Sequence, residues 1–86
     1  MIKLGVHKIN KTFTPNETLE LIGVKLLCIN HPSSGTGYGV YIPNFNSLGT
    51  IKEDGLALSV TCSSWRISIT NNTSSDITVQ GIYLTL

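Results

Sequence analysis

Acid–base and nucleophilic chemistry require a nucleophile or carboxylate beside a histidine or a second carboxylate, and this sequence offers few such groups. Its only histidines are His7 and His31. Asp54 and Asp76 fall in stretches typical of turns, where an aspartate usually bonds the backbone. Because neither a catalytic triad nor a pair of carboxylates can be assembled from these residues, we expect the protein not to be an enzyme.

The two cysteines, Cys28 and Cys62, also lack the spacing of a metal site. There is no CxxC motif and no nearby pair of histidines, so we expect neither a bound zinc nor any other cofactor. Both cysteines lie in apolar runs, and free cysteine is among the most buried residue types. Reduced, buried thiols are therefore favoured, and a disulfide between the two stays open.

A glycine-rich stretch, Gly35-Thr36-Gly37-Tyr38-Gly39, offers backbone N–H groups that could hold an anion or a sugar hydroxyl. A dinucleotide fingerprint opens a helix, whereas here a strand is predicted to follow. The stretch is therefore more typical of a flexible connection between strands.

The candidate ligand-binding residues are His31, Tyr38, Tyr41 and Arg66, because a pocket needs a few convergent polar groups on an apolar wall. The two tyrosines flank the glycine-rich stretch and alternate on a predicted strand, so at least one should be exposed. Trp65 beside Arg66 could stack on a sugar or a base. However, it is in phase with the apolar residues that follow it, and this predicts a place in the core.

Only 13% of the residues are charged, and the net charge is +1. So few charged residues suggest that part of the protein surface is covered by self-association, because small domains often need a partner subunit. The basic residues form no clustered face, so no nucleic-acid partner is expected. They are Lys3, Lys8, Lys11, Lys25, Lys52 and Arg66.

No signal peptide is recognisable, and the apolar stretches are too short to span a membrane, so no membrane partner is expected. Apolar residues alternate with period two and are interrupted by turn residues, which is typical of strands. This predicts one all-β domain over residues 1–86, an antiparallel β-sandwich or jelly-roll-like barrel of about seven or eight strands. The expected strands are 3–13, 18–30, 38–42, 50–53, 56–62, one from residue 65, and 77–86.

Glycine and proline positions suggest how these strands connect. Asp54-Gly55 is the strongest hairpin signal and predicts that strands 50–53 and 56–62 pair with each other. Residues 43–49 are expected to form a loop, and Gly23 is expected to mark a bulge within strand 18–30. Residues 25–29 are apolar on both faces, which indicates a central strand or a subunit contact.

The last part of the chain, Trp65 to Leu86, consists of an apolar strand, an Asn/Thr/Ser turn and a final alternating strand. It resembles the closing hairpin of small bacteriophage β-sandwich domains found at tail-fibre tips and in decoration or baseplate proteins. The resemblance implies a trimer or a higher homo-oligomer that binds host glycans or virion neighbours. It also implies a location in the virion or the host cytoplasm.

These observations favour a non-enzymatic, oligomeric β-sandwich that acts as a virion structural or receptor-binding module. The alternative is a small phage-encoded protein that sequesters a host immune nucleotide signal at subunit interfaces.

Overall fold

The computed structural model describes residues 3–31 and 37–86, and within them the chain is entirely β-structure and turns. Eight antiparallel strands form two sheets, which confirms the predicted fold class. The strands are β1 Gly5–Phe13, β2 Thr18–Ile22, β3 Val24–His31, β4 Gly37–Asn44, β5 Ser47–Asp54, β6 Leu58–Ser63, β7 Arg66–Asn71 and β8 Ile77–Thr85.

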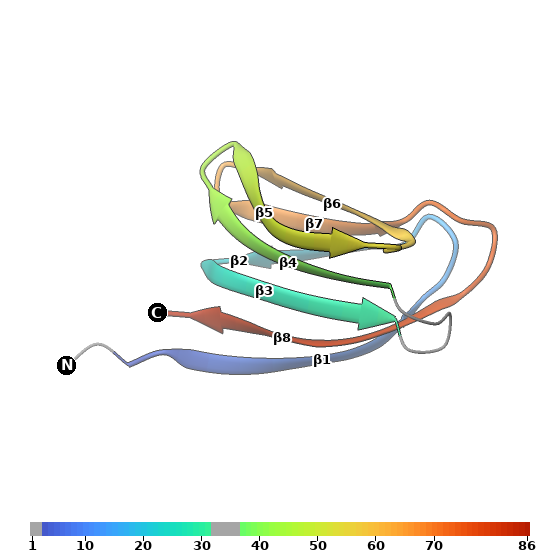
Figure 1. Ribbon diagram of the computed structural model, residues 1–86, viewed down its shortest axis with the longest axis horizontal. Helices are drawn as coiled ribbons and strands as arrows, with labels where there is room; N and C mark the ends of the chain where they lie inside the picture. Colours follow the sequence, from blue (N-terminus) through green and yellow to red (C-terminus); the bar gives the residue numbers. More distant parts are fainter. Residues whose placement is uncertain (1–2, 32–36) are drawn as a thin grey trace.

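The two sheets have unequal numbers of strands. The larger sheet has the order β1-β8-β3-β4-β5, and the smaller has the order β2-β7-β6. The smaller sheet lies against one face of the larger one, and we call the opposite face of the larger sheet its outer face (Figure 1). The chain passes between the sheets after β1, β2, β5 and β7.

The core fills the space between the sheets with every second side chain of the inward faces. Leu27 and Ile29 of β3 are buried there, and β3 is the middle strand of the larger sheet, which is one of the two roles predicted for the apolar stretch 25–29. The buried hydrophobic side chains are Ile9, Phe13, Leu21, Val24, Leu27, Ile29, Tyr41, Leu58, Cys62, Ile67, Ile69, Ile77 and Val79.

The predicted hairpin at Asp54-Gly55 is wrong, and so is the predicted loop over residues 43–49. β4 and β5 run through that segment and pair with each other on either side of a turn at Phe45 and Asn46. Gly55 does adopt a left-handed conformation, with φ of 62°. It carries the chain from the edge of the larger sheet to β6 in the smaller one, where β6 pairs with β7.

The predicted strand 18–30 is divided in two by Gly23, which has φ of 73°. That conformation is accessible to glycine at little cost, and it turns the chain between sheets. β2 before it pairs with β7, whereas β3 after it pairs with β8. Gly23 therefore marks a corner where the chain changes sheet, whereas a bulge within one strand was expected. A shift in the register between β3 and β8 follows it, between Val24 and Leu26.

Trp65 is not a core residue, contrary to the sequence-based prediction. It is 46% exposed and sits with Ser64 in the two-residue turn between β6 and β7. Both residues have positive φ, 51° for Ser64 and 65° for Trp65. This is the primed turn that suits tight hairpins, made without glycine. A side chain in this region costs about 1–2 kcal/mol.

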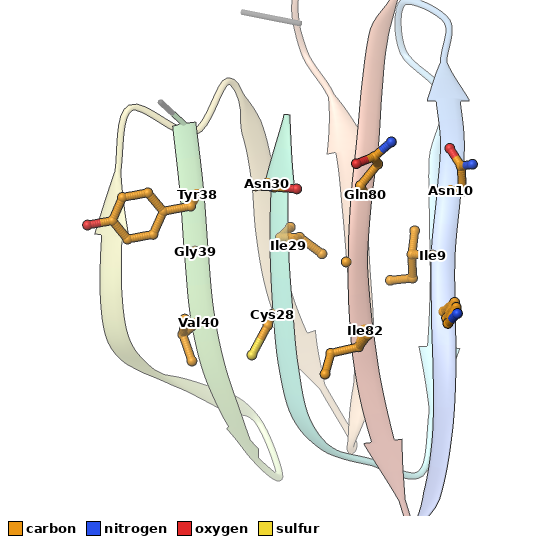
Figure 2. A pocket seen from close by; sticks show the side chains of 12 residues that line it. Ile9, Asn10, Cys28, Ile29, Asn30, Tyr38, Gly39, Val40, Gln80 and Ile82 are labelled. Atoms are coloured by element: carbon orange, nitrogen blue, oxygen red, sulfur yellow. The ribbon is translucent and has the colours of Figure 1, made fainter. Parts of the chain in front are cut away.

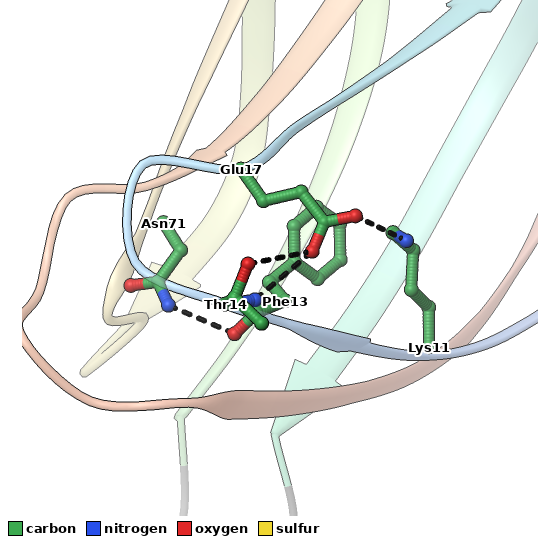
Figure 3. A network of polar contacts seen from close by, with 5 residues as sticks. All are labelled: Lys11, Phe13, Thr14, Glu17 and Asn71. Carbon is green, nitrogen blue, oxygen red and sulfur yellow. Dashed lines mark hydrogen bonds and ion pairs between the residues drawn. The ribbon is translucent and has the colours of Figure 1, made fainter.

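At the opposite end of the sandwich, the buried side chain of Asn71 joins two connections between the sheets (Figure 3). Its Nδ2 donates to the carbonyl oxygens of Phe13, at 3.0 Å, and Ser75, at 2.8 Å. Its Oδ1 accepts from the backbone N–H and the hydroxyl of Thr73. The backbone of Asn71 bonds to Asn16 and Glu17 of the turn after β1. One amide thus satisfies polar groups of both connections.

The turn after β1 is further fixed by the carboxylate of Glu17 (Figure 3). It accepts hydrogen bonds from the N–H and the hydroxyl of Thr14, and it lies 2.6 Å from the ammonium of Lys11. The bond from Lys11, followed by the bond from the Thr14 backbone, lowers the pKa of Glu17. The turn predicted at residues 14–17 is therefore present and is closed by side chains as well as by the backbone.

We expect Asn71→Ala to lower the free energy of unfolding by about 3 kcal/mol, because it removes the buried amide donor to the carbonyl oxygen of Phe13 and the acceptor for the N–H of Thr73. Asn72→Ala, at the exposed neighbour, is the matched control and should change stability by less than about 0.5 kcal/mol. Urea unfolding followed by circular dichroism measures both. Equal, small effects of the two substitutions would contradict this role of Asn71.

Candidate functional site

The outward faces of the two sheets differ in chemistry. The smaller sheet alternates, with buried, mostly aliphatic residues inward and, apart from Ile22 at the end of β2, polar residues outward, as expected of a face in contact with water. Outward on it are Thr18, Glu20, Ile22, Ser59, Thr61, Ser63, Arg66, Ser68 and Thr70. The outer face of the larger sheet instead carries Val6, Leu26, Cys28, Val40, Ile42, Ile82 and Leu84.

This outer face contains a hollow of about 540 Å³ that crosses four strands (Figure 2). That volume is within the range of about 300–1,000 Å³ typical of small-molecule sites. The hollow is lined from β1, β8, β3 and β4 by Lys8, Ile9, Asn10, Cys28, Ile29, Asn30, Tyr38, Gly39, Val40, Gln80, Gly81 and Ile82.

One side of the hollow is a row of polar side chains, which we call the amide row. Asn10 lies opposite Gln80, Gln80 opposite Asn30, and Asn30 opposite Tyr38 in the strand registers. The four side chains follow one another across β1, β8, β3 and β4 in Figure 2. On the next strand, Asp54 is paired with Tyr38. Three carboxamides and a phenol are therefore aligned across the sheet.

The neighbouring row is apolar at its centre and forms the floor of the hollow. Ile82, Cys28 and Val40 are paired with one another across β8, β3 and β4 (Figure 2). Lys8 is paired with Ile82 at one end of this row, and Lys52 with Val40 at the other. An apolar floor beside a line of hydrogen-bonding groups is the usual construction of a binding site for an uncharged polar ligand.

Of the four predicted ligand-binding residues, only Tyr38 lines this hollow. His31 is buried on the inward face of β3. Its Nε2 accepts a hydrogen bond of 2.9 Å from the N–H of Ala57 and lies 3.1 Å from the carbonyl oxygen of Gly55. A backbone N–H can only donate and a carbonyl oxygen can only accept, so each tautomer of the imidazole satisfies one of these two contacts. His31 thus ties β3 to the connection between β5 and β6.

Tyr41 and Arg66 are also placed away from the hollow. Tyr41 is buried on the inward face of β4 and donates a hydrogen bond to the carboxylate of Glu53. Arg66 is on the outward face of the smaller sheet, where its Nε lies 3.5 Å from Glu20. The four residues therefore do not converge on one patch, because strand alternation and the change of sheet separate them.

The glycines near Tyr38 have a packing role. A Cβ on Gly37 would lie 2.0 Å from His31 Nε2, and one on Gly39 would lie 2.3 Å from the hydroxyl of Tyr41. The two glycines thus make room for the rings of His31 and Tyr41 in the core. Gly35 and Thr36, the other part of the predicted anion-binding stretch, lie outside the described residues.

The two cysteines are free thiols on different sheets. Cys62 is buried, as expected, and its thiol donates to the carbonyl oxygen of Phe45. Cys28 is only half-buried, because it points outward into the floor of the hollow.

Sequence reasoning missed Asn10, Asn30 and Gln80. Each occupies an outward position in an alternating strand, so the period-two pattern could have placed each on a solvent face. The pattern could not show that the three strands are neighbours in register, because β1 pairs with β8 across almost the whole length of the chain.

Among residues 3–31 and 37–86, no cluster of His, Cys, Asp and Glu side chains is arranged to hold a metal ion. The described ranges also contain no helix with the length and hydropathy needed to span a bilayer. Comparison of the chain with protein-family models, curated proteins and solved structures found no match to any of them.

The buried phenol of Tyr41 provides a test by pH. Burial, followed by the hydrogen bond to Glu53 and the charge of that carboxylate, raises the pKa of Tyr41 above its ordinary value of 10.0. The unfolded chain therefore loses this proton at lower pH than the folded protein. The contribution of the protonated Tyr41 to the free energy of unfolding is complete below about pH 10 and is lost as the pH rises further.

We expect the free energy of unfolding to fall above about pH 10 more steeply for the wild type than for Tyr41→Phe, by about 1 kcal/mol per pH unit. Urea unfolding at a series of pH values measures both slopes. Other titrating groups are the same in the two proteins and cancel in the comparison. Parallel slopes would contradict the raised pKa.

Proposed function

We propose that this chain is a non-catalytic binding module that recognises an uncharged, polyhydroxylated ligand such as a glycan in the hollow of the larger sheet. The observation that carries the proposal is the amide row, Asn10, Gln80, Asn30 and Tyr38, beside an apolar floor. A receptor-binding role, as suggested by the resemblance to phage β-sandwich domains, is the biological setting that this chemistry fits.

A carboxamide provides two donors and an acceptor on one plane, so it can pair with neighbouring hydroxyl groups of a sugar. Adjacent strands are about 4.8 Å apart, and the row from β1 to β4 therefore extends over about 14 Å. That length suits an extended chain of sugar units better than a single small solute. The floor of Ile82, Cys28 and Val40 supplies apolar surface for the C–H faces of the rings.

A nucleotide, the ligand of the alternative function, is less well matched. Its phosphates need several cationic or N–H donors. Lys8 is the only cationic residue that lines the hollow in the described chain, and Lys52 lies at the far end of the floor row. The exposed carboxylate of Asp54 extends the amide row and would repel an anion.

Self-association is the second part of the proposal. Beyond the floor of the hollow, the next row of the same face is aliphatic: Val6 pairs with Leu84, and Leu84 with Leu26. Ile42 of β4 is 46% exposed on the same face. A copy that covers this row would bury aliphatic surface and leave the amide row at the subunit boundary. A trimer or a higher oligomer stays the expected state.

We expect Asn30→Ala and Gln80→Ala each to weaken glycan binding about five- to tenfold, because each removes hydrogen bonds from an exposed position without disturbing the core. The probe is the tightest binder from a panel of neutral oligosaccharides, measured by isothermal titration calorimetry. Thr61→Ala, on the outward face of the smaller sheet, is the control and should leave the affinity unchanged.

Two outcomes would contradict this assignment. One is a saccharide that binds with the same affinity to all three variants. The other is a panel in which no saccharide binds while a nucleotide does, which would favour sequestration of a nucleotide signal.

We expect multi-angle light scattering to give a mass of at least three chains, and Ile42→Lys to lower it by placing a charge on the aliphatic row. Thr61→Lys adds the same charge to the other outward face and should leave the mass unchanged. A wild-type monomer at all concentrations tested would rule out this assembly.

A further inference from the structure

Three turns meet at one end of the sandwich and form a surface that the proposed ligand site does not use. They connect β2 to β3, β4 to β5 and β6 to β7, and the polar connections held by Asn71 lie at the other end (Figure 1). We call this surface the aromatic tip and define it by Ile22, Lys25, Phe45, Trp65 and Arg66.

The two aromatic residues of the tip are exposed in backbone conformations that bulky side chains rarely adopt. Phe45 has φ of 53° and is 51% exposed, and Trp65 has φ of 65°. Large residues with positive φ are outliers that persist only where the surrounding structure holds them, and they gather at functional sites. Neither ring is buried, so packing in the core does not account for either conformation.

Hydrogen bonds between the two turns hold the rings in place. The N–H of Trp65 donates to the carbonyl oxygen of Phe45 at 2.8 Å, and the N–H of Ser64 donates to Oδ1 of Asn46 at 2.7 Å. The rings lie edge to face with centroids 6.2 Å apart. Because one turn belongs to each sheet, the bonds fix the aromatic pair relative to the whole sandwich.

The residues around the pair are aliphatic and basic. Ile22 is 70% exposed, and the ammonium of Lys25 lies 5.5 Å from the centre of the Trp65 ring. Arg66 follows Trp65 and is paired with Glu20, at 3.5 Å and with both side chains more than half exposed. The tip thus combines Trp, Phe and Ile with two cations and the one carboxylate of Glu20, which leaves a net positive charge.

Apart from Glu20, which is paired with Arg66, the side-chain carboxylates are distant from the tip. Glu53 and Asp54 end β5, whose first residue follows the tip, and Glu17 and Asp76 lie in the connections at the opposite end (Figure 1). The molecule extends over 43 Å along this axis. It therefore has a basic, apolar end and an acidic, polar end.

We propose that the aromatic tip binds the surface of an anionic lipid membrane, with Phe45, Trp65 and Ile22 inserted at the level of the headgroups. Aromatic and aliphatic side chains next to lysine and arginine suit the boundary between headgroups and acyl chains. The positive end faces the negative lipid, and the distant carboxylates are directed away from it. A second copy placed tip to tip would instead bring like charges together.

This inference reverses the sequence-based expectation that no membrane partner exists, which considered only membrane-spanning segments. A tip that lies on the surface needs no such segment. Binding of the tip to a membrane also leaves the hollow of the larger sheet free for a ligand, so the proposed ligand site and the proposed membrane contact can fail independently.

Trp65 is the only tryptophan, and its fluorescence reports on the tip directly. We expect its emission to shift to shorter wavelength, and to be quenched by brominated acyl chains, when the protein is mixed with vesicles of phosphatidylserine and phosphatidylcholine. Vesicles of phosphatidylcholine alone should bind at least about fivefold more weakly. Co-sedimentation with the same vesicles gives the affinities.

Phe45→Asn removes the ring but keeps a residue that tolerates positive φ, and we expect it to bind the anionic vesicles about tenfold more weakly. Lys25→Gln should weaken this binding about fivefold and leave that to neutral vesicles unchanged. Ile51→Asn is the control: Ile51 is 60% exposed on β5, outside the tip, and its substitution should have no effect.

The proposal is overturned if the emission of Trp65 is the same with and without vesicles. It is also overturned if Phe45→Asn and Ile51→Asn reduce binding equally. A wild-type oligomer that Phe45→Asn dissociates, with no vesicle binding, would instead assign the tip to a contact between copies.

Discussion

The three-stranded sheet covers only one face of the five-stranded sheet. The smaller sheet buries the inward residues of the larger one, from Phe13 and Val79 to Leu27 and Tyr41, and nothing in the chain described covers the outer face. That face nevertheless carries aliphatic residues where the smaller sheet carries serine and threonine. A ligand or a second copy would therefore bury the most apolar surface by binding to the outer face. The amide row would give that contact its specificity.

The two ends of the sandwich join the two sheets with opposite chemistry. At one end Asn71 satisfies the polar groups of two connections with a single buried amide. At the other, one turn of each sheet is joined by the bonds from Trp65 to Phe45 and from Ser64 to Asn46, while the two aromatic side chains stay in solvent. The first arrangement stabilises the fold, whereas the second maintains an exposed apolar surface, which is why we assign it to binding.

The alternating pattern was sufficient to predict the fold class, because that depends on local periodicity, and the apolar stretch 25–29 predicted either a central strand or a subunit contact, of which the first describes β3. It did not predict which strands pair. Pro43 and Gly49 resemble loop residues but lie in strands, and Asp54-Gly55 resembles a hairpin but joins two sheets. The candidate site was predicted only at Tyr38, since the burial of His31 and Tyr41 depends on the space left by Gly37 and Gly39.

The central claim is that the outer face of the larger sheet is open to binding, and Cys28 tests it most directly because its thiol lies in the floor of the hollow. The measurement is alkylation of the native protein, with the modified cysteine identified by peptide mass spectrometry. The account predicts that Cys28 reacts at least about tenfold faster than the buried Cys62, since reactivity follows exposure. Equal protection of both thiols would show that the hollow itself is closed and would contradict the account.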